Sequence, residues 1–250
     1  MNFRHAEILT RAREAGRVSV HDLARDFGVT VQTVRRDLAE LCETGQLARV
    51  HGGAVLPSGT NNIGYEDRRL LNAEAKERIG RAAAALIPNG ASVFLDIGTT
   101  PEAVAQGLLR HEGLMVVTNN INVAGVLSAN AGAEILLAGG LLRRSDGGLV
   151  GDVTADFVRQ FKVDVAVIAA SALDEDGDVL DFDFREVRVA QAVMAKARRT
   201  VLVAESSKFG RTAPVRMGDV GDFGVFVTDA PVPARFRAVA ERAGTQIVLA

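Results

Sequence analysis

Residues 28–38 have the sequence GVTVQTVRRDL, and this stretch decides how the front of the chain folds. Gly28 and Val29 are suited to a tight turn, and the hydroxyl of Thr30 can cap a helix that starts after it. With about 3.6 residues per turn, the apolar side chains of that helix share one face and must point into a core. These apolar residues are Val31, Val34, Leu38 and Leu41. The stretch therefore predicts a turn followed by an amphipathic helix.

A second helix is predicted just before this turn. Ser19 can cap it, Asp22 lies three residues later in its first turn, and Gly28 ends it. Another amphipathic helix precedes Gly16. Residues 46–51 and 54–56 are typical of two short strands around a glycine turn. Residues 1–57 therefore predict a winged helix-turn-helix domain.

The polar face of the helix after the turn has the chemistry of a DNA reader. Amide and guanidinium groups near a helix N-terminus can hydrogen-bond adenine and guanine edges in a major groove. Basic side chains on the hairpin are placed to contact phosphates or the minor groove, as a wing does. The predicted DNA-contacting residues are Thr30, Gln32, Thr33, Arg35, Arg36, Arg49 and His51. The alternative is a small protein-interaction module whose polar face meets only water.

The composition changes near residue 60. Residues 1–57 contain eight arginines, no lysine and seven acidic residues, whereas the rest of the chain is acidic enough to give the whole protein a formal net charge of −2. Residues 57–64 (PSGTNNIG) between the two parts are rich in turn formers. We therefore expect one domain at 1–57 and another at 75–250, joined by a linker at 58–74.

After residue 75, apolar runs alternate with amphipathic stretches. Continuous runs of Val, Ile and Leu favour strands covered on both faces, and the alternation favours parallel βα units. The predicted strands are 91–97, 114–118, 134–138, 163–170, 200–205, 224–228 and 245–249. The predicted helices are 75–87, 101–109, 121–128, 153–161, 185–197 and 233–242. This pattern predicts a Rossmann-like α/β domain.

Turns follow three of the predicted strands, at residues 96–100, 118–120 and 138–140. In open α/β sheets, ligands bind beyond the carboxyl ends of the strands, and the N–H groups at a helix N-terminus suit a phosphate. Gly98 permits close backbone approach, Thr99 and Thr100 supply donors, and Lys208 follows another strand, where it could neutralise the same anion. Taken alone, each of these turns is more often a simple connection between elements than a part of a binding site.

The sequence argues against several classes of protein. It has no run of roughly 18 apolar residues, as a membrane span needs, and its start lacks the apolar segment of a signal peptide. One cysteine, Cys42, excludes an internal disulfide framework and a cysteine-cluster zinc site. The acidic stretch 174–178 lacks calcium-loop spacing and favours a hairpin turn. We therefore expect a cytoplasmic protein with no cofactor, no metal and no membrane partner.

Two ungapped stretches, residues 28–38 and residues 45–54 (GQLARVHGGA), resemble the signature of the DeoR/GlpR family of bacterial transcription regulators. The turns after residue 75 match the family's effector half in order. The resemblance implies a winged helix-turn-helix domain followed by an effector domain that is similar in fold to ribose-5-phosphate isomerase and senses phosphorylated sugars or related metabolites. The chain departs from the family at Ile97, where serine is common, and at Glu205, where aspartate is usual.

The resemblance also extends the expected effector site. Asp183 and Glu186 match acidic positions of the family's pocket, where they would accept sugar hydroxyls. Together with the residues of the turns, the expected effector contacts are Asp96, Gly98, Thr99, Thr100, Asn119, Gly139, Gly140, Asp183, Glu186 and Lys208.

We therefore expect a repressor of a carbohydrate-metabolism operon, a homo-oligomer (dimer or tetramer) that binds double-stranded operator DNA and releases it when a phosphorylated metabolite binds. The competing class is a sugar-phosphate isomerase with an accessory DNA-binding head. Asp96, Asp183, Glu186 and Lys208 would then supply the carboxylate base and the cation that isomerisation needs. Because an isomerase has no need of a DNA-reading helix, the sequence favours a regulator that is not an enzyme.

Overall fold

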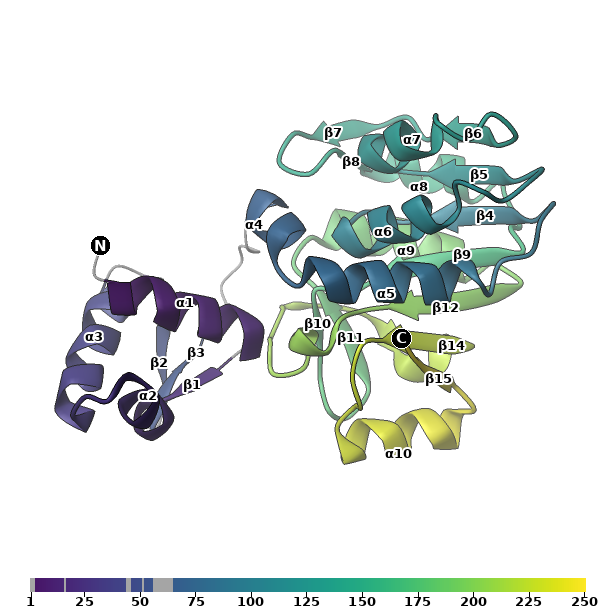
Figure 1. Ribbon diagram of the computed structural model, residues 1–250. Helices are drawn as coiled ribbons and strands as arrows, with labels where there is room; N and C mark the ends of the chain where they lie inside the picture. Colours follow the sequence, from purple (N-terminus) through teal and green to yellow (C-terminus); the bar gives the residue numbers. More distant parts are fainter. Residues whose placement is uncertain (1–2, 16, 44–45, 51, 56–64) are drawn as a thin grey trace.

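The computed structural model describes residues 3–15, 17–43, 46–50, 52–55 and 65–250, which form a small N-terminal unit and a larger α/β unit (Figure 1). We call the N-terminal unit, residues 1–57, the head. Its elements are α1 (Phe3–Ala15), β1 (Arg17–Ser19), α2 (Val20–Phe27), α3 (Val31–Glu43), β2 (Ala48–Val50) and β3 (Gly53–Val55). The three predicted helices and the predicted hairpin are confirmed.

Local chemistry sets the helix ends of the head. The Ser19 hydroxyl accepts a hydrogen bond from the N–H of Asp22 at 3.5 Å, and Gly28 ends α2 with φ of 63°. The apolar stripes of all three helices meet in one core around Ile8, Leu23 and Val34, which are fully or almost fully buried. Strand β1, three residues long and without a pattern of its own, was not predicted; it pairs with β3 on the side opposite β2.

The larger unit contains a seven-stranded parallel sheet, and all seven predicted strands are present. They are β4 (Ser92–Leu95), β5 (Met115–Thr118), β6 (Glu134–Leu137), β9 (Val165–Ala169), β12 (Arg199–Val203), β14 (Val225–Thr228) and β15 (Gln246–Leu249). Their order in the sheet is β15-β14-β12-β9-β4-β5-β6. Successive strands are therefore added outward from β4 to β6 on one side of the sheet and outward from β9 to β15 on the other. The switch point between β4 and β9 leaves a crevice at the carboxyl ends of the strands.

All six predicted helices are present and cover both faces of the sheet (Figure 1). They are α5 (Ala73–Ala84), α6 (Thr99–Gly107), α7 (Ile121–Leu127), α8 (Asp152–Val158), α9 (Phe184–Met194) and α10 (Ala234–Ala243). Helices α5, α6 and α7 pack on one face, and α8, α9 and α10 pack on the other. Alternate residues of each central strand enter the two cores, which explains why the strands are continuous apolar runs.

The sequence did not predict the short elements of this unit. They are α4 (Tyr65–Leu70), β7 (Leu141–Arg143), β8 (Gly148–Val150), β10 (Ala172–Leu173), β11 (Asp178–Asp181), β13 (Val215–Asp219) and the 3₁₀ turns η1 (Ser206–Lys208) and η2 (Val220–Asp222). None is longer than six residues, so none shows a readable period. Residues 174–177 form the turn between β10 and β11, so the acidic stretch 174–178 lies in a hairpin turn as predicted, with Asp178 as the first residue of β11.

Helix α4 and the start of α5 fall within residues 58–74, where a linker was predicted. Across the described part of the chain, no helix combines the length and apolarity needed to cross a membrane, and no cluster of three or more His, Cys, Asp and Glu side chains could hold a metal ion.

Candidate DNA-reading face and effector site

Helix α3 presents polar side chains away from the core of the head. Gln32, Arg35 and Arg36 are exposed, and Thr33 is half-buried at the edge of the same face. The Nε of Arg36 donates to Oε1 of Glu40 at 3.2 Å, yet 83% of the Arg36 side chain is accessible. Exposed pairs of this kind contribute little to stability, so the guanidinium can exchange its partner for a base edge or a phosphate.

The other predicted DNA contacts divide into two groups. Thr30 has a structural task, because its Oγ1 accepts a hydrogen bond from the N–H of Thr33 at 3.2 Å and caps α3 as predicted. Arg49 lies in β2 opposite Ala54, but the structure does not describe its side chain, and His51 lies outside the described residues. The contacts predicted for the hairpin therefore stay predictions.

A buried ion pair, which the sequence did not reveal, fixes α3 to α1. Asp37 is 4% exposed, and its carboxylate accepts hydrogen bonds from Nε and Nη2 of Arg4 at 2.7 and 3.2 Å. The hydrogen bonds from Arg4 lower the pKa of Asp37. Asp37 follows the exposed Arg36 directly, so this contact sets the rotation at which α3 presents its polar face.

At the carboxyl end of β4, Asp96 lies fully buried, and neither of its oxygens has a hydrogen-bond partner of good geometry in the described residues. Burial raises the pKa of Asp96 to about 7; the backbone N–H groups of Ile97 and Ala169 oppose this shift, and the charge of Asp181 adds to it. A buried carboxylate whose hydrogen bonds are incomplete is costly, and it is typical of a site that awaits a ligand.

The turn after Asp96 starts α6. Gly98, with φ of 134°, adopts a conformation that strains any other residue, and it places the N–H groups of Thr99 and Thr100 at the first turn of this nine-residue helix. Ile97 is buried beside Gly148 of β8. The donors predicted for a phosphate thus lie at the switch point of the sheet.

Asn119 and Lys208 occupy the ends of two further strands. Asn119 is buried after β5; its Nδ2 donates to the carbonyl of Leu149 at 3.2 Å, while its Oδ1 has no partner among the described residues. Lys208 is buried in η1, with its Nζ 3.5 Å from Oε1 of Glu205. Burial, followed by the charge of Arg211, lowers the pKa of Lys208 to about 7, and Glu205 opposes the shift.

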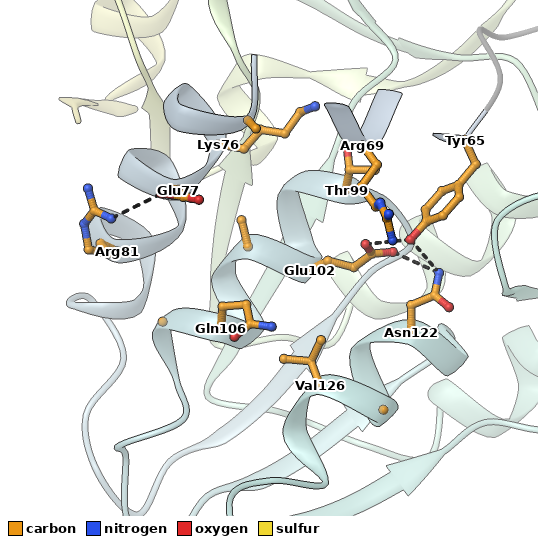
Figure 2. A pocket seen from close by; sticks show the side chains of 14 residues that line it. Tyr65, Arg69, Lys76, Glu77, Arg81, Thr99, Glu102, Gln106, Asn122 and Val126 are labelled. Atoms are coloured by element: carbon orange, nitrogen blue, oxygen red, sulfur yellow. Dashed lines mark hydrogen bonds and ion pairs between the residues drawn. The ribbon is translucent and has the colours of Figure 1, made fainter. Parts of the chain in front are cut away.

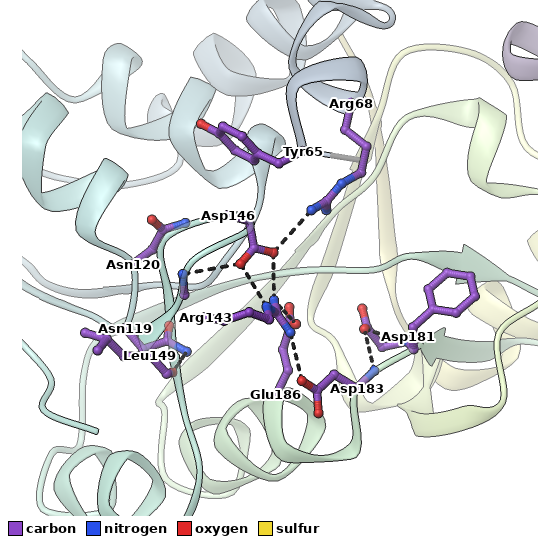
Figure 3. A network of polar contacts seen from close by, with 12 residues as sticks. Tyr65, Arg68, Asn119, Asn120, Arg143, Asp146, Leu149, Asp181, Asp183 and Glu186 are labelled. Carbon is purple, nitrogen blue, oxygen red and sulfur yellow. Dashed lines mark hydrogen bonds and ion pairs between the residues drawn. The ribbon is translucent and has the colours of Figure 1, made fainter. Parts of the chain in front are cut away.

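Asp183 and Glu186 belong to a network centred on Arg143 (Figure 3). Arg143 donates to Asp183 Oδ2 at 3.0 Å, to Glu186 Oε2 at 2.5 Å and to both oxygens of Asp146 at 2.8 Å. Burial raises the pKa of Glu186 well above its usual range, the charge of Asp181 adds to the shift, and Arg143 opposes it. Arg143 and Asp146 were not predicted, although they lie in a charged segment, RRSD, between two glycine pairs.

Gly139 and Gly140, which were also predicted to contact the effector, lie against α8 rather than in the described network around Arg143. They are exposed after β6, and the hydroxyl of Thr154 in α8 donates to the carbonyl of Gly139 at 2.8 Å. A Cβ on Gly140 would approach the Thr154 hydroxyl to 2.0 Å. In the described structure, no hydrogen bond or ion pair joins these glycines to Asp96, Glu186 or Lys208, so their observed task is to shape the turn against α8.

A surface pocket of about 830 Å³ opens beside this edge of the sheet, between α4, α5, α6 and α7 (Figure 2). Of the predicted effector contacts, Thr99 alone lines this pocket; Asp96, Glu186 and Lys208 are buried and do not. At one side of the pocket, Tyr65 of α4 donates a hydrogen bond to Oε2 of Glu102 at 2.9 Å.

Comparisons with known proteins cover nearly the whole chain. Two family models match it: a DeoR-like helix-turn-helix domain over residues 4–60 and a DeoR C terminal sensor domain over residues 71–230. The glycerol-3-phosphate regulon repressor of Escherichia coli (strain K12) is 47% identical over 230 residues, which cover 92% of this chain and 91% of that protein. The HTH-type transcriptional repressor CsqR of the same organism is 37% identical, over 99% of this chain and 95% of that protein.

Among solved structures, a D-ribose-5-phosphate isomerase in complex with phospho-erythronic acid covers 55% of this chain and 54% of its own, with 13% identity and a TM-score of 0.42.

Proposed function

The chain belongs to the DeoR family of transcriptional regulators, and from this premise we propose that it is a repressor whose hold on operator DNA is released by a phosphorylated metabolite. We call residues 65–250 the sensor domain. The observation that carries the proposal is the combination, in one chain, of an exposed Gln and Arg face on α3 with buried, incompletely paired charges at the switch point of a parallel sheet.

The head would read the operator through α3. Gln32, Arg35 and Arg36 supply the amide and guanidinium donors that distinguish bases in a major groove. A homo-oligomer, dimer or tetramer, would present two heads to two half-sites related by a twofold axis.

The sensor domain would hold the effector at the carboxyl ends of β4, β5 and β12. The N–H groups of Thr99 and Thr100 and the ammonium of Lys208 suit a phosphate. The oxygens of Asp96 and Oδ1 of Asn119, which lack a hydrogen bond of good geometry within the described residues, suit hydroxyl groups. Two relatives repress glycerol-3-phosphate regulons by name, so glycerol 3-phosphate is the first effector to test.

Release would follow from a shift between two populations of the protein. The effector favours the arrangement to which it binds more tightly, and it weakens DNA binding only by the difference in its affinity for the two arrangements. The direct test starts by selecting an operator from a random DNA pool. Glycerol 3-phosphate is then added to the complex of protein and operator, and release of the DNA is measured. In parallel, a thermal-shift screen tests other phosphorylated polyols. A ligand present at 100 times its Kd adds about 2.7 kcal/mol to stability.

Replacing Arg36 with alanine tests the reading face. We expect discrimination between the selected operator and a scrambled duplex to fall about tenfold or more, because one lost bidentate base contact costs about 1–3 kcal/mol. Thermal stabilisation by the effector should not change. Arg25→Ala removes the same charge from an exposed site on α2 and should leave discrimination nearly intact. Equal losses in both variants would show that α3 is not the reader.

Lys208 makes effector binding depend on pH. Because burial holds its pKa at about 7, Lys208 loses its charge above neutral pH, and a bound anion would raise that pKa again. Binding above pH 7 should therefore take up a proton, and affinity should fall by up to about tenfold per pH unit. Calorimetry in buffers of different ionisation enthalpy measures this uptake.

The matched control for this experiment is Lys208→Arg, which keeps its charge throughout the range and should flatten the profile. Asp96 titrates in the same range, so the comparison isolates the contribution of Lys208. An unchanged proton uptake in Lys208→Arg would remove Lys208 from the site. In addition, Lys208→Ala should lose the response to effector and keep operator discrimination, the reverse of Arg36→Ala.

The isomerase alternative has a simple test of its own. Named relatives of the chain are repressors, which favours a regulator over an enzyme. Turnover of ribose 5-phosphate by the purified protein would reverse this preference.

A further inference from the structure

Helix α4, which lies within the predicted linker, is docked on the rest of the sensor domain by Glu102, Asn122 and Lys76. The hydroxyl of Tyr65 donates to Glu102 of α6 at 2.9 Å and accepts from Nδ2 of Asn122 of α7 at 3.0 Å. At the other end of α4, the buried ammonium of Lys76 donates to the carbonyls of Arg68 and Leu71. Among the described helices of the sensor domain, α4 is the one nearest in sequence to the head.

Arg68 points from α4 into the polar network of the sensor domain (Figure 3). Its Nη2 donates to Oδ2 of Asp146 at 3.2 Å, the same carboxylate that pairs with Arg143. The Arg68 side chain is 16% exposed, and its Nε is buried with no hydrogen-bond partner among the described residues. A guanidinium donor that is buried and unused is costly unless a ligand takes it up.

Arg68 lies near other buried or partly buried cations. Its charge acts on Lys76, Lys208 and Arg211, and the pKa of each is lowered, with burial as the largest cause. Glu205 is the one carboxylate that acts on all three, and its Oε2 has no partner within the described residues. Arg68 and Lys208 each have a carboxylate beside them, Asp146 and Glu205, yet burial still lowers the pKa of Lys208 and its neighbours, so an additional anionic group would be favourable here.

We propose that Arg68 is a ligand for the anionic group of the effector, which it shares with Lys208, so that the effector acts directly on the helix that carries the head. The inference rests on the proposed function for the nature of the effector. In the unliganded protein, Arg68 pairs with Asp146. When the anion binds, the guanidinium turns its unused Nε to the anion and its bond with Asp146 weakens, which displaces α4.

The opposing interpretation is that Arg68 only ties α4 to Asp146. A purely structural residue would contribute to stability without changing effector affinity or its coupling to DNA. Coupling between two sites is reciprocal, so the ratio of effector affinities in free and operator-bound protein measures it.

The experiment uses the full chain as wild type, Arg68→Met, Arg68→Lys and the control Arg81→Met, which removes an exposed arginine of α5. Calorimetry measures the Kd of glycerol 3-phosphate with and without a saturating selected operator duplex. Inorganic phosphate is the second probe, because the proposed contact is to the anion alone. Circular dichroism melts check that each variant is folded.

For Arg68→Met we expect a Kd weaker by about tenfold or more, as for the loss of a charge-assisted hydrogen bond, and a free-to-bound affinity ratio close to one. Arg68→Lys should recover part of the affinity, and Arg81→Met should match wild type. Wild-type affinity in Arg68→Met, or weaker affinity with an unchanged ratio, overturns the inference while leaving the proposed function intact.

Two other outcomes concern the proposed function itself. If wild type binds phosphate through Arg68 but glycerol 3-phosphate and related esters never release DNA, the proposed function fails and the anion contact stands. If wild type binds none of these anions, both fail.

Discussion

Replacing Arg143 with methionine is expected to lower the free energy of unfolding of the sensor domain by about 3–5 kcal/mol, as for the loss of one partner of a buried ion pair. Arg143 is 21% exposed and holds three carboxylates, those of Asp146, Asp183 and Glu186. Methionine fills a similar volume but leaves these carboxylates facing one another. Denaturant melts followed by circular dichroism measure the loss, with Arg144→Met, an exposed neighbour, as the matched control.

The deficit of Arg143→Met should depend on pH and on Glu186. Burial already raises the pKa of Glu186 well above its usual range, and the loss of Arg143 would raise it further, so Glu186 of the variant takes up a proton at a higher pH than Glu186 of wild type. The deficit should therefore shrink at pH 5, and Arg143→Met/Glu186→Gln should recover part of it at pH 7. A deficit equal to that of Arg144→Met at both pH values would show that the network does not stabilise the domain.

The parts of the fold that were predictable are those with a repeated pattern. Continuous apolar runs identified all seven strands of the large sheet, because both faces of that sheet are covered by helices. The stripe that includes Val34 and Leu38 oriented α3 and so placed Gln32 and Arg36 outside. Periodicity is a signal that comes from burial, and these residues are either deeply buried or directly opposite buried ones.

The parts that were missed depend on pairings between distant segments. Aspartate is usually a surface residue, but Asp37 is buried because Arg4, 33 residues away, forms an ion pair with it. Arg143 lies in a three-residue strand, and its role emerges only when α9 brings Glu186 beside it. Tyr65 and Arg68 lie within a predicted linker, where no local sequence pattern predicts a helix docked on the domain.

The same distinction applies to the predicted effector contacts. Asp96 and Lys208 followed strands in the sequence, and the structure buries both at the carboxyl ends of those strands. Gly139 and Gly140 also followed a strand, but β6 is an edge strand, and its turn packs against α8 instead. Position after a strand thus predicts proximity to the switch point only for the central strands.

Replacing Asp96 with asparagine is expected to stabilise the sensor domain at neutral and higher pH and to abolish its response to effector. The pKa of Asp96 is raised to about 7, mainly by burial, whereas in an unfolded chain it is about 3.9. Native Asp96 therefore loses its proton less readily than unfolded Asp96, and the cost of ionising it grows from pH 4 to pH 7. That difference corresponds to at most about 4 kcal/mol above pH 7, and the new amide, which also needs partners, reduces the gain.

The sign of this prediction is what makes Asp96→Asn informative. Stability of the variant and of wild type should agree near pH 4, and the variant should become the more stable protein as the pH rises through 7. Asp229→Asn is the matched control, because the carboxylate of Asp229, after β14, accepts hydrogen bonds from the N–H and hydroxyl of Ser206 at 2.6 and 3.2 Å. A satisfied carboxylate should lose stability on the same change. If Asp96→Asn also destabilised the domain at pH 8, its carboxylate would be a structural element of the fold, and the case that this edge of the sheet awaits a ligand would lose its main support.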